Sequence, residues 1–219
     1  MTLKMGKIKA HQKYYTKDGI LVPGVTTVVG VLAKPALIPW ANKLGLQGIE
    51  VGKFVDSLAD VGTLCHTIIE CYLKNQKVDY SDYTPNQREL AENAAKKFFD
   101  WEKKNTFKAL QSELQLVSEK YMFGGTCDIY CELNDKKTLI DIKTSKGCYP
   151  EHFTQVAAYR LLLRENGYQV EDTKILRIGR EEAEGFDEKE VPLIDIHEEK
   201  FLACLKILQI DNKLKVNKL

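Results

Sequence analysis

The chain has 219 residues, enough to bury a sizeable core in one domain, and its 44% hydrophobic and 29% charged residues are typical of a soluble globular protein. No apolar run reaches membrane-spanning length and the N-terminal MTLKMGKIKA lacks the apolar centre of a secretory signal, so we expect a cytoplasmic protein without a membrane partner. The net charge of +1 neither supports nor excludes a nucleic-acid partner, because the distribution of charge matters more than its sum.

Charge is unevenly distributed along the chain. Residues 1–17 carry five lysines and no acid, and the C-terminal end carries four more, whereas residues 181–190 are mostly acidic. The terminal lysines are Lys4, Lys7, Lys9, Lys13, Lys17, Lys206, Lys213, Lys215 and Lys218. Segregated charge of this kind could guide a polyanion, but lysine-rich termini are more often simply solvated, and we favour that interpretation.

The first half of the chain is expected to be mostly helical. Residues 14–23 predict two short strands around an Asp-Gly turn. Residues 26–35 and 36–45 predict two short helices, the first ending at a proline and the second at a glycine. Apolar residues recur at helical spacing over 61–74, and a further helix is expected over about 85–105, with a proline in its first turn.

The second half changes to the period of strands and then alternates. The three expected strands are residues 107–118, 121–132 and 137–144. Residues 152–167 return to helical spacing, 174–180 predict a short strand, and 197–215 predict an amphipathic helix. This order predicts an α/β fold with a mixed central β-sheet flanked by helices.

Two of the expected strands carry acidic side chains. In the run LIDIKTSK, residues 139–146, alternation places Asp141 and Lys143 on one face, opposite Ile142. In the preceding strand it places Asp128 opposite Cys127, Ile129 and Cys131. If the strands pair, Asp128 and Asp141 can converge at one sheet edge with Lys143 beside them. Two converging carboxylates repel each other unless a cation lies between them, and hard oxygen ligands favour Mg²⁺ or Mn²⁺.

Such a metal site can cut phosphodiester bonds, because the cation polarises a phosphoryl oxygen and lowers the pKa of a water. Lys143 would orient that water or stabilise charge on the phosphate. Glu113, on the preceding strand, is a candidate further ligand or base. Gln155 and Tyr159 lie one helical turn apart on one face, where they could reach the site or hold a nucleotide.

Each motif also has a purely structural interpretation. An Asp-x-Lys sequence on a strand is usually an exposed ion pair, and a Gln-x-x-x-Tyr sequence on a helix is usually packing. A Gly-Gly-x-x-Asp sequence can be a turn entering a strand, and His66 on an amphipathic helix is more often a core histidine than a ligand. Only their joint order and spacing favour a catalytic site.

That joint arrangement, over residues 61–165, resembles the motif series of RecB-type nucleases in the PD-(D/E)XK superfamily. The matching motifs are GTLCH ending at His66, a strand carrying Glu113, GGTCD ending at Asp128, LIDIKTSK, and QVAAY with Gln155 and Tyr159. Residues 14–32 also look like the lead-in of phage-type and mitochondrial genome-maintenance-type exonucleases of this group.

The resemblance implies a fold, a set of ligands and a set of catalytic residues. The implied metal ligands are His66, Asp128, Asp141 and the backbone carbonyl of Ile142. The implied catalytic groups are Asp128, Asp141, the lysine Lys143, Glu113 of the acidic cluster, and the supporting pair Gln155 and Tyr159. The implied fold is a mixed sheet between helices in one domain, with a lead-in over residues 1–60, a nuclease core over 61–180 and a C-terminal helical segment over 181–219.

The cysteines and missing motifs narrow the expectation. The six cysteines are Cys65, Cys71, Cys127, Cys131, Cys148 and Cys204. They form no Cys-x-x-Cys pair, and the late cysteine triplet of cluster-containing relatives is absent, so we expect reduced core thiols and no iron–sulfur cluster. The chain carries no Gly-Lys-Ser/Thr phosphate loop, so unwinding would require a helicase or recombination partner.

We therefore expect a Mg²⁺- or Mn²⁺-dependent deoxyribonuclease, an exonuclease on single-stranded DNA or DNA ends. The resemblance places it in phage or bacterial replication, recombination or repair. One alternative is an endonuclease of the same superfamily, and a second is a non-catalytic nucleic-acid-binding module with this fold. A third is a small-molecule α/β enzyme whose motifs match by accident. The order of the residues leaves the polarity of digestion, the number of metals and the oligomeric state open.

Overall fold

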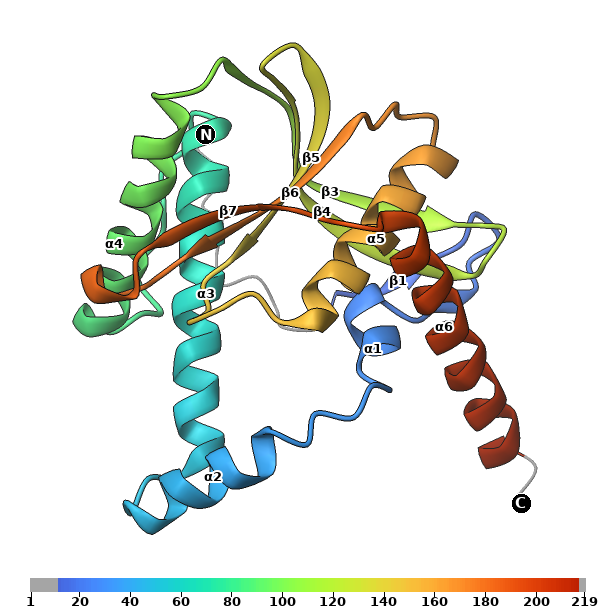
Figure 1. The fold of residues 1–219 in the computed structure, drawn as a ribbon, viewed down its shortest axis with the longest axis horizontal. Coiled ribbons are helices and arrows are strands. Elements are labelled where there is room, and N and C mark those ends of the chain that lie inside the picture. Colours follow the sequence, from blue (N-terminus) through green and yellow to red (C-terminus); the bar gives the residue numbers. More distant parts are fainter. Residues whose placement is uncertain (1–11, 217–219) are drawn as a thin grey trace.

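A twisted five-stranded sheet forms the centre of the protein in the computed structural model, which describes residues 12–216 (Figure 1). Helices α3 and α4 cover one face of this sheet, and α1, α5 and α6 cover the other. The strand order is β3-β4-β5-β6-β7, in which β5 and β6 run parallel and the other neighbours run antiparallel. The α/β fold with a mixed central sheet between helices is therefore confirmed.

The three expected strands of the meander are present. They are β3 (Phe107–Ser118), β4 (Phe123–Leu133) and β5 (Lys136–Lys143). A tight turn joins β4 to β5, and its two residues, Asn134 and Asp135, both have positive φ, of 48° and 65°. Asn and Asp tolerate this backbone region better than other non-glycine residues, which explains why the hairpin turns at this point.

An N-terminal hairpin attaches to the middle of the chain. Strands β1 (Tyr14–Tyr15) and β2 (Leu21–Val22) pair as expected and are followed by α1 (Val25–Val29) and α2 (Leu37–Leu46). The Gly124 N–H donates to the Pro23 carbonyl at 3.0 Å, which ties this lead-in to β4. The two short helices are confirmed, but both predicted ends are wrong: α1 ends at Val29, before the expected proline, and α2 continues through the expected glycine.

Helices α3 (Val51–Leu73) and α4 (Pro85–Glu102) pack side by side on one face of the sheet. The α4 N-terminus has a reciprocal capping box between Thr84 and Gln87, which satisfies two backbone donors. The start predicted for α3, at residue 61, is wrong by ten residues. Its first turns project from the body of the protein and are mostly exposed (Figure 1), so they have no apolar stripe that faces a core.

The C-terminal half contains α5 (Pro150–Glu165), β6 (Asp172–Ile178) and α6 (Ile194–Val216), as expected, and one further strand. That strand is β7 (Phe186–Glu190), which lies at the sheet edge in the segment predicted only to be acidic. Its sequence, FDEKE, has low strand propensity, so pairing with β6 rather than local propensity stabilises this strand. Ion pairs across the two strands, such as Arg177 Nε to Asp187 Oδ2 at 2.8 Å, hold it in place.

The sheet divides the hydrophobic core into two parts, and most of the cysteines are buried in this core. All six cysteines are free thiols, of which five are buried and Cys148 is partly buried. The expectation that the cysteines are core residues is therefore confirmed for five of them. No described helix is long and apolar enough to cross a membrane.

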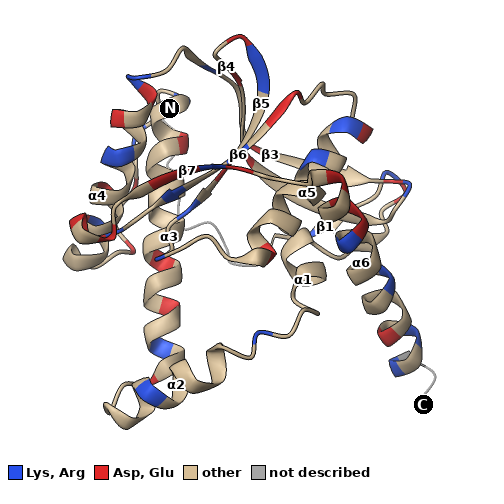
Figure 2. Cartoon of the chain, viewed as in Figure 1, with Lys and Arg blue, Asp and Glu red and all other residues tan. Residues whose placement is uncertain are grey.

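The terminal lysines do not form a continuous basic surface within the described residues. Positions 4, 7, 9 and 218 lie outside the described part of the chain. The lysines of α6 are interspersed with acidic residues such as Asp211 (Figure 2). This arrangement is consistent with simple solvation of the terminal charges.

Candidate metal centre

The candidate site lies where two central strands separate. Strands β4 and β5 pair up to Ile129 and Ile140, and β5 then continues beside β6 alone. At this point the Asp128 carboxylate accepts a hydrogen bond from the Ile142 N–H at 2.7 Å. The Ile142 N–H thus bonds to the Asp128 side chain in place of a backbone carbonyl of β4. The expected position at a sheet edge is wrong, because β4 and β5 are both inner strands.

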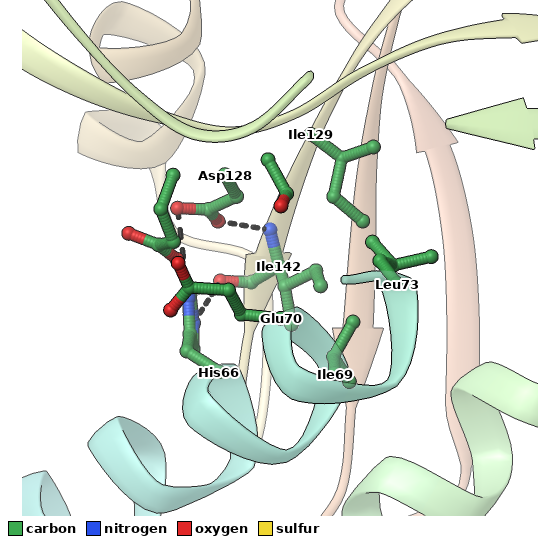
Figure 3. A pocket seen from close by; sticks show the side chains of 9 residues that line it. His66, Ile69, Glu70, Leu73, Asp128, Ile129 and Ile142 are labelled. Atoms are coloured by element: carbon green, nitrogen blue, oxygen red, sulfur yellow. Dashed lines mark hydrogen bonds and ion pairs between the residues drawn. The ribbon is translucent and has the colours of Figure 1, made fainter. Parts of the chain in front are cut away.

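Three side chains from three elements meet at this separation. His66 extends from α3 toward Asp128 and Ile142 (Figure 3). Its Nδ1 lies 3.5 Å from Glu113 Oε1 and 3.6 Å from Asp128 Oδ1. One ligand atom from each of the three residues lies within 4.8 Å of the others. This is the spacing that ligands around a single cation require.

An irregularity in β3 and β4 makes the meeting possible. Glu113 has a φ of 50°, in the left-handed region that non-glycine residues rarely adopt. It lies between two regular pairs, Ser112 with Ile129 and Leu114 with Cys127. The strict alternation expected for β4 is wrong here, because Cys127 packs on the α5 side and Ile129 on the α3 side. The broken alternation lets Glu113 and Asp128 both face α3.

The second ring nitrogen of His66 is also engaged. His66 Nε2 lies 3.2 Å from the Ile142 carbonyl oxygen. A proton on Nε2 would be donated to this carbonyl and would leave Nδ1 free to bind a cation beside the two carboxylates. In this geometry the Ile142 carbonyl orients the histidine, and its expected contact with a metal stays a prediction.

Asp141 and Lys143 form a close pair next to this set. Lys143 Nζ lies 2.7 Å from Asp141 Oδ2 and 2.9 Å from Oδ1, and only 1% of the Asp141 side chain is exposed. Alternation along β5 is as expected, since Leu139 packs on the α5 side and Ile142 on the α3 side. The compact ligand set contains Glu113 rather than Asp141, whose oxygens contact the lysine.

Burial and neighbouring charges shift the pKa values of the acids, the histidine and the lysine at this site. Burial raises the pKa of Asp128 and of Asp141, and the neighbouring carboxylates raise each of them further. Burial alone would lower the pKa of His66, but Asp128 and Glu113 outweigh it and raise that pKa to about 9. Burial likewise opposes the charge on Lys143, yet Asp141 and Asp128 raise its pKa above the ordinary value.

The donor set fits a divalent cation. His66, Glu113 and Asp128 supply one nitrogen and two carboxylate oxygens, and a divalent charge would relieve the repulsion among the carboxylates. Carboxylate oxygens suit Mg²⁺ and Mn²⁺, and an imidazole nitrogen suits the transition metals. The structure therefore contains an acidic group able to hold a metal ion.

Gln155 and Tyr159 are close to each other but not bonded to the acids. Gln155 Nε2 donates to the Tyr159 hydroxyl at 2.9 Å and to Thr26 Oγ1, in α1, at 3.3 Å. Burial raises the pKa of Tyr159 well above its ordinary value, and the charges of Asp141 and Asp128 raise it further. The pair therefore links α5 to α1 beside the site, and its contact with a nucleotide stays a prediction.

Glycines in two motifs allow the elements of the site to approach closely. A Cβ on Gly125 would lie 2.8 Å from the Tyr159 ring, and one on Gly62 would lie 2.8 Å from Thr144 Oγ1. The glycine of GTLCH therefore makes room for the end of β5, and that of GGTCD makes room for α5. Both motifs mark contacts between segments far apart in the sequence.

One acidic residue at the site was missed. Glu70 lies on α3 one turn after His66, is 4% exposed, and lines the same small cavity as His66, Glu113 and Asp128. The four-residue spacing from His66 places both side chains on one helix face and could have identified it.

Comparisons with known proteins support the fold. No protein-family model and no curated protein sequence matches the chain. A crystal structure of a putative exonuclease from Eubacterium rectale aligns with a TM-score of 0.52 and 14% identity, over 74% of this chain and 68% of that one. An alkaline exonuclease from Laribacter hongkongensis aligns at 17% identity over 74% of this chain and 91% of that one, with a TM-score of 0.35. The first likeness shows a shared fold, and it agrees with the mixed α/β architecture expected from the sequence.

Proposed function

We propose that this protein is a Mg²⁺- or Mn²⁺-dependent deoxyribonuclease, an exonuclease that acts on single-stranded DNA or DNA ends. The observation that carries the proposal is the convergence of His66, Glu113 and Asp128 within 4.8 Å, beside the Asp141–Lys143 pair. The likeness in fold to a putative exonuclease agrees with this chemistry.

The roles of the residues follow from their contacts. His66, Glu113 and Asp128 would hold the cation, with Asp141 as a further expected ligand beside them. The bound cation would act as a Lewis acid on the phosphoryl oxygen and promote deprotonation of the attacking water. Lys143, an ammonium aimed by Asp141, would donate a hydrogen bond to the phosphate as charge develops on it.

Other residues act by orientation. The Ile142 carbonyl holds the His66 ring through Nε2, and the Ile142 N–H holds the Asp128 carboxylate. Gln155 and Tyr159, already bonded to each other, would contact a nucleotide at the edge of the site. A role in phage or bacterial DNA replication, recombination or repair, in the cytoplasm and with a helicase partner, would suit such an enzyme.

The test is digestion of 5′- and 3′-labelled single-stranded, duplex and closed circular DNA, with Mg²⁺, Mn²⁺ or excess chelator. Cleavage of linear but not circular DNA, dependent on metal, is expected. Asp128→Asn should abolish it, and Asp100→Asn, a change at an exposed carboxylate on α4, should not. Cleavage of closed circles would indicate an endonuclease. Binding without cleavage would indicate a non-catalytic module, and full cleavage in chelator would reject the metal.

A further inference from the structure

A buried carboxylate beneath the metal centre has one oxygen without a partner. Glu70, on α3, is 4% exposed, and its Oε1 pairs with Lys74 Nζ at 2.5 Å. Its Oε2 is buried and makes no hydrogen bond. A buried carboxylate oxygen left unpaired is costly, so native proteins normally supply it with a water, an ion or a donor.

This carboxylate faces a small cavity that it shares with the metal ligands. The cavity has a volume of about 10 Å³. Its polar lining comes from His66, Glu70, Ser112, Glu113 and Asp128 (Figure 3). This volume is about the space that a single water requires, and a buried water needs two to four polar partners.

Ligand spacing favours a water over a second cation in this cavity. The described residues contain one set of three ligand groups close enough to hold an ion, and Glu70 does not belong to it. A cation bound by Glu70 would therefore lack enough protein ligands. A water would have enough partners in the carboxylates of Glu70 and Glu113.

We propose that one water in this cavity donates hydrogen bonds to Glu70 Oε2 and to the Glu113 carboxylate, and so makes Glu70 a positioning residue of the metal centre. The inference rests on the proposed metal-dependent function. Glu113 needs such support because its backbone has a φ of 50°, which non-glycine residues rarely adopt. A water shared by two carboxylates holds Glu113 at ligand distance and carries no charge that would compete with the cation.

Removal of a residue that orients a metal ligand typically weakens metal binding by about 10- to 100-fold. The measurement is Mn²⁺ affinity and stoichiometry by calorimetry, without DNA, on the full chain. Glu70→Leu replaces the carboxylate with an apolar side chain and should weaken Mn²⁺ binding about tenfold. Its melting temperature in chelator is the folding control, because a variant that melts close to the wild type shows that the lost affinity does not come from unfolding. Glu70→Gln retains an amide that can bond the water and should lose less affinity.

Lys74→Met is the matched control, since it removes the ion pair and keeps Glu70. Near-normal Mn²⁺ affinity in Lys74→Met and a crystallographic water between Glu70 and Glu113 would support the proposal. Unchanged affinity in Glu70→Leu, or an equal loss in Lys74→Met, would overturn it. A wild-type stoichiometry of two that falls to one in Glu70→Leu would replace the water with a second cation. Failure of the unaltered protein to bind Mn²⁺ would reject the proposed metal function itself, and the role of Glu70 with it.

Discussion

Lys143 is expected to be needed for stability as well as for cleavage, and Lys143→Met should show both effects. The mutation leaves Asp141, which is 1% exposed, without the ammonium that contacts both of its oxygens. Breaking a buried ion pair by removing one partner costs about 3–5 kcal/mol. For a chain of this size that loss should lower the melting temperature in chelator by roughly 6–20 °C.

A second variant separates the two effects. Lys143→Met with Asp141→Asn removes both charges and should recover most of the lost stability, yet it should remain inactive in single-turnover cleavage. Because burial raises the pKa of Asp141, protonation should also reduce the deficit of Lys143→Met as the pH falls. Calorimetry in chelator measures the stability. A single mutant as stable as the wild type at pH 8 would show that the pair contributes nothing and would refute the reasoning.

Three further predictions concern the metal, the pH and the packing. Mn²⁺ at 100 times its Kd should stabilise the wild type by about 2.7 kcal/mol. This corresponds to a rise of roughly 5–11 °C in melting temperature, and Asp128→Asn should lose it. A full rise in the mutant would exclude Asp128 as a ligand. A proton on His66, whose pKa is about 9, competes with the cation. Mn²⁺ affinity measured by calorimetry should therefore rise with pH up to about 9 and then level off. An affinity independent of pH would contradict this. Gly125→Ala places a Cβ 2.8 Å from the Tyr159 ring and should lower the free energy of unfolding, measured by chemical denaturation, by about 1–3 kcal/mol. The control is Gly147→Ala, which has no atom within 4 Å of the added Cβ and should leave stability unchanged.

The spacing of apolar residues in the sequence was sufficient to predict the helices and strands that bury one face. The strands β3 to β5 and the helices α4 to α6 each place apolar residues against the divided core, so their spacing carries the signal. The first turns of α3 and the edge strand β7 were missed for the opposite reason. Both are largely exposed, and β7 is stabilised by pairing with β6, which no local pattern records.

The residues of the site were predictable, but their mutual roles were not. Motif order identified His66, Glu113, Asp128, Asp141 and Lys143, and the structure brings all five together. Their contacts depend on where β4 leaves β5 and on the positive φ in β3, and neither follows from alternation. For the same reason the contact between the Ile142 carbonyl and the His66 ring could not be predicted.

Glu70 illustrates a different limit. Its position four residues after His66 was visible in the sequence, yet an acid at that spacing is usually solvated. Only the docking of α3 against the sheet shows that this side chain is buried. Motif patterns therefore indicate which residues can bind, whereas the surrounding packing decides which residues hold them in position.

The distance along the chain between the parts of the centre has a consequence for newly made protein. His66 bonds to Ile142 across 76 residues, and Asp128 bonds to Ile142 across 14. A growing chain therefore carries the histidine and the acids for some time before β5 exists to bring them together, and contacts between distant segments form late because closing a long loop costs entropy. An unfinished or unfolded chain contains the expected ligands without the centre, so the proposed hydrolytic activity would exist only in molecules that have completed their central sheet.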